Sequence, residues 1–283
     1  MNILITWWNG MLWSTFNQTQ ILEQAWHIVH YTDHHNFDIT RISQITSFVQ
    51  EHPIDLIINC AAYTNVEQAE ENLLNYQVNT LWVINLAKIC ADNNIKIIHI
   101  STDYVFDGSK KEWYLTDDIV WPLNKYGTAK RLWEQCLLRL CSSAKIVRTS
   151  WLYGWGKEFK NFVNTMITLA ETKTELSIIN DQRWAPTFTN DLVNSISSLI
   201  TNRNNDDHTI FHFCNHAEQW WITRFNFAQE IFSYLWKDIA LNPIPSSQYP
   251  TKAKRPTYSR MINNSTIQLP DWRKSLSLYL NNL

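Results

Sequence analysis

The chain has 283 residues, a formal net charge of -2 and 18% charged residues, so it lacks the basic field that nucleic acid binding needs. No apolar run reaches the roughly 18 residues of a membrane-spanning helix, and the N-terminus reads as a strand rather than as a signal peptide. We therefore expect a cytoplasmic globular protein that binds neither nucleic acid nor membrane.

Cysteine and histidine usage indicates neither disulfides nor a metal. The five cysteines are odd in number, lie mostly in apolar settings and show no zinc-site spacing. Four histidines gather in one predicted strand and the loop after it, namely His27, His30, His34 and His35. We expect reduced thiols and no metal site.

Glycine is unusually scarce. Average usage near 7% predicts roughly 20 glycines in a chain of this length, whereas the chain has 5, beside 15 tryptophans. The tryptophans fall where turns are expected.

The N-terminal pattern is a strand, a turn and a helix. Residues 1–6 form an apolar strand, residues 7–13 the turn, and a helix follows from about residue 14 to residue 24. A second strand over residues 27–33 places Asp33 about twenty residues past the turn, where a carboxylate bonds a ribose hydroxyl of a dinucleotide. Asp33 and Asp38 fit ordinary turns equally well.

The next segments continue the alternation of helix and strand. A helix over residues 45–51 is closed by Pro53, and a buried strand over residues 55–60 leads into small residues, which let a dinucleotide lie close to the backbone. Residues 66–94 read as helical.

The most informative stretch runs from residue 97 to residue 130. A buried strand over residues 97–100 ends near Thr102, and ligands bind at the carboxyl ends of parallel strands. Tyr126 and Lys130 then lie four apart on one helix face. A nearby ammonium lowers the pKa of a phenol from roughly 10, so Tyr126 would give a proton to a carbonyl oxygen that Thr102 holds, while a reduced nicotinamide supplies hydride. Without such a strand end before it, a Tyr/Lys pair at this spacing would not indicate a catalytic site.

The C-terminal half adds a strand over residues 144–149 and helices over residues 161–170, 191–200 and 225–235. We predict an α/β fold with a Rossmann-type doubly wound parallel sheet and a smaller α+β substrate-binding domain. Residues 1–150 and about 185–215 would form the dinucleotide-binding domain, interleaved with a substrate-binding portion over residues 151–184 and 216–283. Arg255 suits a diphosphate, or is a plain surface arginine.

Six segments carry a family resemblance. They are residues 59–64, 101–108, 122–130, 148–154, 181–187 and 249–256. In these segments the chain resembles the dTDP-4-dehydrorhamnose reductases, which are extended short-chain dehydrogenases/reductases, although sister members share many of the motifs. The resemblance implies reduction of the 4-keto group of a nucleotide sugar, dTDP-4-dehydrorhamnose, by NADPH or NADH, to give dTDP-rhamnose for surface polysaccharide. It leaves open whether the protein forms a homodimer.

The resemblance also implies site residues. The catalytic residues would be Thr102, Tyr126 and Lys130. The cofactor-binding residues would be Gly10, Met11, Leu12, Asp33, Asp38, Ile39, Ala61, Ala62, Tyr63, Asn79 and Lys130. The substrate-binding residues would be Thr102, Asp103, Tyr104, Val105, Tyr126, Trp151 and Arg255.

Several tryptophans stand where the resembled family has glycine. Trp7 and Trp13 occupy the first and third glycine positions of its G-x-x-G-x-x-G turn, and others follow at Trp26, Trp113, Trp133, Trp155, Trp184, Trp220 and Trp236. An indole at position 7 would project toward the pyrophosphate and one at position 13 would wedge helix from strand. We expect impaired or lost cofactor binding, unless the loop takes another path.

Three hypotheses follow from this pattern. The first is the family enzyme, marked by its Thr102, Tyr126 and Lys130. The second is a non-catalytic regulatory or binding member of the family. The third is an engineered glycine-depleted variant without activity.

Overall fold

The fold is taken from a computed structural model, which describes residues 1–6, 10–32, 38–154, 156–202, 208–217 and 222–283. Its centre is a parallel sheet in which the strands follow the order β10-β5-β4-β3-β1-β2. These strands are β1 (Asn2–Thr6), β2 (Ile28–Tyr31), β3 (Leu56–Asn59), β4 (Lys96–Thr102), β5 (Ala144–Thr149) and β10 (Ile210–His212). The order reverses between β1 and β3, so the predicted doubly wound sheet is confirmed, and its ligand crevice is expected outside the carboxyl ends of these strands.

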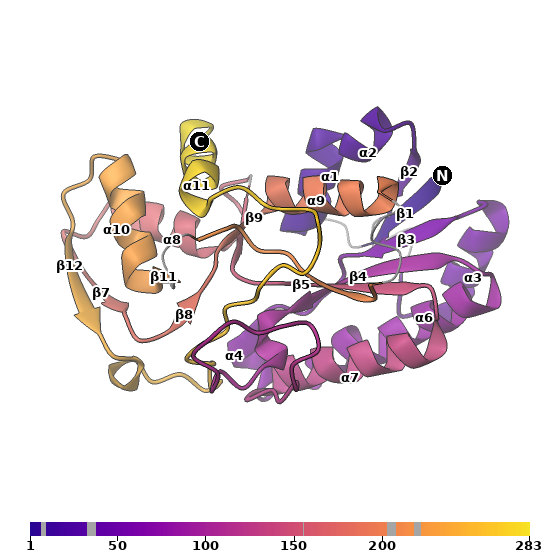
Figure 1. Ribbon diagram of the computed structural model, residues 1–283, viewed down its shortest axis with the longest axis horizontal. Helices are drawn as coiled ribbons and strands as arrows, with labels where there is room; N and C mark the ends of the chain where they lie inside the picture. Colours follow the sequence, from indigo (N-terminus) through magenta and orange to yellow (C-terminus); the bar gives the residue numbers. More distant parts are fainter. Residues whose placement is uncertain (7–9, 33–37, 155, 203–207, 218–221) are drawn as a thin grey trace.

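Helices cover both faces of the sheet (Figure 1). One face carries α3 (Ile42–Glu51), α6 (Trp82–Asp92) and α7 (Lys125–Leu140), and the other carries α1 (Met11–Thr19), α2 (Ile21–Gln24) and α9 (Thr189–Thr201). Alternate residues of β1 explain the two layers, because Leu4 packs into the first core and Ile3 and Ile5 into the second. The near-continuous apolar runs in the strands are therefore buried on both sides.

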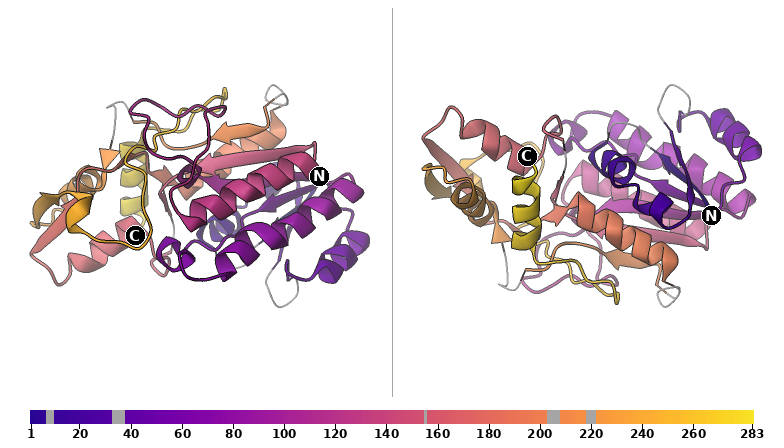
Figure 2. Two further views of the ribbon diagram at one scale, coloured as in Figure 1. Left: turned by 90° about the horizontal axis from the view of Figure 1, so that it is seen from below. Right: turned by 90° about the horizontal axis from the view of Figure 1, so that it is seen from above.

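A smaller unit lies beside the carboxyl ends of the strands (Figure 2). It contains α8 (Phe162–Leu169), β7 (Glu175–Ile179), β8 (Arg183–Trp184), β11 (Ile222–Thr223), α10 (Arg224–Tyr234), β12 (Ala240–Ile244) and α11 (Trp272–Asn281). Its own core includes stacked rings of Phe162 and Phe227. Two short strands, β6 (Leu152–Tyr153) and β9 (Thr187–Phe188), pair where the chain crosses between the units. The domain boundaries given above stay a prediction.

Several predicted elements differ in detail. The helix predicted over residues 14–24 begins at Met11 and is interrupted at Gln20, whose φ of 48° ends α1 before α2 begins. The helix predicted over residues 66–94 is divided into α4 (Val66–Ala69), α5 (Leu74–Tyr76), the π-helical turn η1 (Gln77–Leu81) and α6. The helix α11 was not predicted.

Most of the described tryptophans at predicted glycine positions fall into two structural groups, whereas Trp113 is half-buried beneath the guanidinium of Arg260. Trp13, Trp133 and Trp184 are buried, and their indole N–H groups have no hydrogen-bond partner. Trp26 and Trp236 are exposed and have positive φ angles of 62° and 52°. Residues other than glycine rarely adopt this backbone conformation. The predictions for Trp7, Trp155 and Trp220 lie outside the described residues.

Candidate active site

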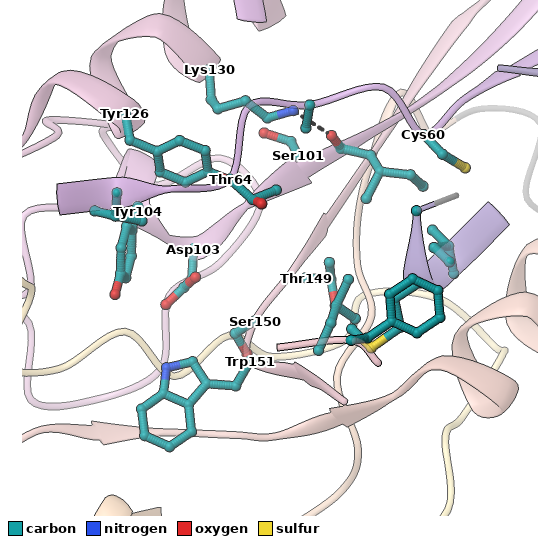
Figure 3. A pocket seen from close by; sticks show the side chains of 18 of the residues that line it. Cys60, Thr64, Ser101, Asp103, Tyr104, Tyr126, Lys130, Thr149, Ser150 and Trp151 are labelled. Atoms are coloured by element: carbon teal, nitrogen blue, oxygen red, sulfur yellow. Dashed lines mark hydrogen bonds between the residues drawn. The ribbon is translucent and has the colours of Figure 1, made fainter. Parts of the chain in front are cut away.

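A cavity of about 560 Å³ opens at the carboxyl edge of the sheet. Its walls come from the start of α1, the segments that follow β3, β4 and β5, and the inner face of α7. Figure 3 shows Lys130 and Tyr126 on one side of this space and Trp151 on the other, with Asp103 and Tyr104 between them. Such a volume is typical of small-molecule sites.

The first turn of α1 forms one end of the cavity. Gly10 is the N-cap residue and makes no side-chain cap hydrogen bond, and the first turn has no acidic residue. Gly10, Met11 and Leu12 all line the cavity. Because the first N–H groups of a helix have no partner within it, this end of the cavity suits a phosphate group.

Trp13 lines the same end of the cavity. Its indole packs edge-on against Tyr31, with ring centroids 5.4 Å apart. Helix α1 nevertheless stays in the packed layer, where Thr15 donates a hydrogen bond to Thr189 of α9 over 2.8 Å. Trp13 itself belongs to the same buried cluster as Ile3 and Ile5 of β1, and its indole takes up space beside the start of α1.

Helix α7 brings Tyr126 into the cavity. Asn124 caps the helix by accepting a hydrogen bond from the Gly127 N–H over 2.8 Å. A Cβ at Gly127 would lie 2.1 Å from the carbonyl oxygen of Tyr104, so glycine lets the helix lie directly against the turn η2 (Asp103–Val105). The rings of Tyr126 and Tyr104 then meet edge to face at 5.9 Å.

Tyr126 and Lys130 are both buried, but the side chains have different partners. Burial raises the pKa of Tyr126 above its ordinary value, opposed by a hydrogen bond with Thr102. The Nζ atom of Lys130 is instead 2.8 Å from Nε2 of His99 and donates to the carbonyl oxygen of Ile100 over 2.7 Å. In this arrangement the amine is engaged below the cavity, and the expectation that Lys130 lowers the phenol pKa stays a prediction.

Asp103 is a second titratable group in the cavity wall. Its carboxyl group accepts hydrogen bonds from Ser259 over 2.6 Å and from Thr102 over 3.2 Å. Burial raises the pKa of Asp103 to about 7, although both hydrogen bonds act to lower it. The group is therefore poised between its neutral and charged forms near neutral pH.

Trp151 forms the opposite wall, with a φ of 45°. The guanidinium of Arg224 lies over the rings of Trp151 and Trp184, at 4.6 Å and 4.7 Å from their centroids. The two indole rings are only 3.5 Å apart between centroids, which is closer than the 4.5–7 Å that aromatic pairs prefer. The wall is overpacked at Trp184, where the resembled family has glycine.

Some predicted site residues support the cavity from outside. Asn79 braces the loop after β3 through its bonds to the backbone of Tyr63, both 2.9 Å long. Arg255 pairs with Glu67 over 2.5 Å, and Asp38 caps the Thr40 N–H. Several predicted residues do not line the cavity, namely Asp38, Ile39, Ala61, Tyr63, Asn79, Thr102, Val105 and Arg255. Asp33 lies outside the described residues.

Sequence reasoning missed part of the lining. The additional residues are Trp13, Cys60, Thr64, Val66, Ile100, Ser101, Thr149, Ser150, Leu152, Phe159 and Lys160. Thr149 and Ser150 lie at the end of β5, so the rule that identified Thr102 at the end of β4 could have found them. Below the cavity, Glu134 forms a buried ion pair with Arg148 over 2.8 Å, which no local sequence pattern indicates.

Among the residues that the structure describes, no group of histidine, cysteine or carboxylate side chains could hold a metal ion. In the same part of the chain no helix is long and apolar enough to cross a bilayer.

Comparison with known proteins assigns the chain to a family. The family model for the RmlD substrate binding domain matches residues 1–283. The chain is 34% identical to the dTDP-4-dehydrorhamnose reductase of Escherichia coli over 269 residues, which cover 90% of this chain and 88% of that protein.

Two solved structures are also similar over the full length. A dTDP-4-dehydrorhamnose reductase of Clostridium acetobutylicum is 34% identical, with a TM-score of 0.92 over 100% of this chain and 99% of that one. The enzyme of Bacillus anthracis, solved in complex with NADP, is 34% identical, with a TM-score of 0.90 and the same coverage.

Proposed function

Since the chain belongs to the family of the RmlD substrate binding domain, we propose that it is an NADPH- or NADH-dependent reductase of the 4-keto group of dTDP-4-dehydrorhamnose. The observation that carries this proposal is a single cavity that joins the uncapped start of α1 to Tyr126. A phosphate site and a proton donor in one space are what hydride transfer from a dinucleotide requires.

The residues present fit a dinucleotide at the start of α1. Gly10, Met11 and Leu12 would hold its phosphates, and Ala62 would lie along it. When bound, the nicotinamide supplies hydride. Tyr126 would then give its phenolic proton to the carbonyl oxygen of the substrate, and Thr102 would bind that same oxygen.

The other wall of the cavity would receive the sugar. Trp151 offers an apolar face opposite Tyr126. Asp103 would accept hydrogen bonds from sugar hydroxyls at its carboxyl group, and Arg255 remains our candidate for the diphosphate.

The proposal includes an impaired cofactor site. Trp13 lies beside the phosphate-binding turn, and Trp7 precedes it in the sequence. A thermal melt with and without saturating NADPH tests cofactor binding, because a ligand that binds only the folded state must stabilise it. We expect little shift for the chain as it stands and a clear rise in Tm for the double variant Trp7→Gly, Trp13→Gly. No rise in the double variant would contradict the role of this turn.

The reaction itself is tested in the glycine-restored background. We expect reduction of dTDP-4-dehydrorhamnose, followed as loss of NADPH absorbance, and at least a hundredfold lower kcat for Tyr126→Phe, because general acid catalysis contributes roughly 10²–10⁴-fold. The NADPH-dependent rise in Tm should remain in that variant. Equal turnover would remove Tyr126 from the acid role.

The second candidate is an engineered glycine-depleted variant without activity. It is favoured by Trp26 and Trp236, since both are exposed indoles at positive φ and make no contribution to a core. A chain that shows no activity even with glycine restored at positions 7 and 13 would support it. The presence of Tyr126 and Lys130 in the cavity argues against a non-catalytic member of the family.

A further inference from the structure

A buried chain of hydrogen bonds runs beneath the cavity and ends at Lys130. It consists of Thr6 on β1, Asn59 on β3 and His99 on β4, which are direct partners in the register of three adjacent strands. Each of these side chains, and that of Lys130, is at most 1% exposed. Their protonation is therefore set by one another rather than by water.

The orientation of the Asn59 amide is fixed by a donor that cannot change. The backbone N–H of Ala61 donates to Oδ1 of Asn59 over 3.1 Å, and the Thr6 hydroxyl donates to the same oxygen over 2.6 Å. The amide nitrogen, Nδ2, therefore faces Nδ1 of His99, 3.0 Å away. Since an amide nitrogen only donates, Nδ1 of His99 must accept.

The tautomer of His99 follows from this contact. Burial lowers the pKa of His99 well below its ordinary value, so the ring is neutral and carries one proton. With Nδ1 accepting, that proton is on Nε2, which lies 2.8 Å from Nζ of Lys130. An ammonium at Nζ would place two donors against each other.

We propose that Asn59 and His99 are positioning residues that hold Lys130 as a neutral amine. The amine lone pair accepts from His99, one N–H donates to the carbonyl oxygen of Ile100 over 2.7 Å, and a second N–H remains for a ligand in the cavity. To become charged, Lys130 would need His99 to move its proton to Nδ1 and Asn59 to turn its amide away from the Ala61 N–H. The catalytic role of Lys130 rests on the proposed function, but the test of its charge requires neither cofactor nor substrate.

Of the groups around Nζ, Glu134 acts to raise the pKa of Lys130, but burial outweighs it. Glu134, one turn along α7, is held by two bonds from Arg148 and by the Ser101 hydroxyl. Burial raises the pKa of the Cys60 thiol to about 12, so it is neutral.

Two further neighbours are neutral. The phenol of Tyr126, one turn before Lys130, is kept protonated by burial. The ring of Trp133 lies 6.0 Å from Nζ, at the limit of a cation–π contact. Burial lowers the pKa of Lys130 to about 7, although Glu134 acts to raise it.

The first test reads the tautomer directly. Long-range ¹H–¹⁵N spectra of the full labelled chain at pH 8 should show His99 protonated at Nε2 only, with the signal assigned by its loss in His99→Gln. In Asn59→Asp the carboxylate can only accept, so we expect the proton at Nδ1. Asn93→Asp, an exposed site with the same change of charge, should leave the tautomer unchanged. Protonation of His99 at Nδ1 in the unsubstituted chain would overturn the proposal.

The second test reads the charge of Lys130 from stability. A base with a lowered pKa in the folded state takes up a proton on unfolding, so its contribution to stability is full above its ordinary pKa and is lost as pH falls toward the folded value. Relative to Lys130→Met, the unfolding constant of the unsubstituted chain should fall about tenfold per pH unit as pH rises between about 7 and 10.5. A pH-independent ratio in urea titrations would show that Lys130 is charged and contradict the assignment.

Discussion

Asp103 couples the cavity to the stability of the fold. Because burial raises its pKa to about 7, its protonated form is favoured in the folded state. This contribution to stability is full below the unfolded value of 3.8 and is lost as pH rises through about 7. Relative to Asp103→Asn, the free energy of unfolding of the unsubstituted chain should fall by about 4 kcal/mol between pH 4 and pH 7.5. Urea titrations at several pH values measure this difference, and a constant difference would contradict it.

Asp107 provides a control of opposite sign on the same loop. Burial acts to raise its pKa, but hydrogen bonds from Ser109 and Tyr114 outweigh burial and hold the pKa below its ordinary value. Its contribution is present above that ordinary value and is lost as pH falls. Asp107→Asn should therefore not reproduce the loss of relative stability between pH 4 and pH 7.5.

At the same scale, sequence spacing predicted some contacts of the site and not others. The four-residue spacing of Tyr126 and Lys130 placed both in one cavity, since i and i+4 share a helix face. The bond from Lys130 to His99 depends on how β4 lies beneath α7, and no local pattern contains that information. The engagement of Lys130 below the cavity was therefore not predictable from spacing alone.

Helix α7 depends on one close backbone approach. Gly127 lies in the first turn, where alanine would favour the helix by roughly 0.5–1 kcal/mol. A Cβ there would lie 2.1 Å from the carbonyl oxygen of Tyr104, so α7 and η2 would have to separate, at a cost of about 1–3 kcal/mol. We expect Gly127→Ala to lower the free energy of unfolding, as measured by urea titration. Gln135→Ala on the exposed face of the same helix should change it by at most about 0.5 kcal/mol. A stabilised Gly127→Ala would contradict this packing.

The elements themselves were predictable where apolar periodicity was strong. The run over residues 97–100 predicted β4, and similar runs predicted β1, β3 and β5. The break at Gln20 was not predictable, because glutamine carries no preference for the left-handed conformation that ends α1. The π-helical turn η1 likewise interrupts a pattern whose spacing is helical throughout.

Across the whole molecule, the buried tryptophans lower the stability of the core through close ring contacts and unpartnered N–H groups. The rings of Trp133 and His99 lie 3.2 Å apart between centroids, closer than the 4.5–7 Å that aromatic pairs prefer. The unpartnered indole N–H groups of Trp13, Trp133 and Trp184 each cost roughly 1–3 kcal/mol. A native domain has a total stability of about 5–15 kcal/mol, so these costs together are large. Substitutions that stabilise the fold by even about 1 kcal/mol should therefore raise its Tm measurably.

Trp26 and Trp236 are the two sites at which we expect substitution by glycine to raise the free energy of unfolding. The left-handed conformation costs about 1–2 kcal/mol for a residue with a Cβ, and glycine avoids this cost while adding about 0.4–1 kcal/mol of unfolded-chain entropy. Because the indoles are 93% and 95% exposed, their removal loses almost no packing. Each substitution to glycine should therefore stabilise the fold by roughly 0.5–1 kcal/mol, or about 1–4 °C in Tm.

The two effects should add in the double variant, because Trp26 follows α2 and Trp236 follows α10, in separate units of the fold. Trp121 is the matched control, since it is 63% exposed but does not have a positive φ. Trp121→Gly should give no gain or a small loss, because it raises the entropy of the unfolded chain and removes the contact of the Arg131 guanidinium with the indole, 5.7 Å from the ring centroid, without relieving backbone strain. If all three substitutions shifted the calorimetric Tm equally, backbone strain at Trp26 and Trp236 would not be the cause.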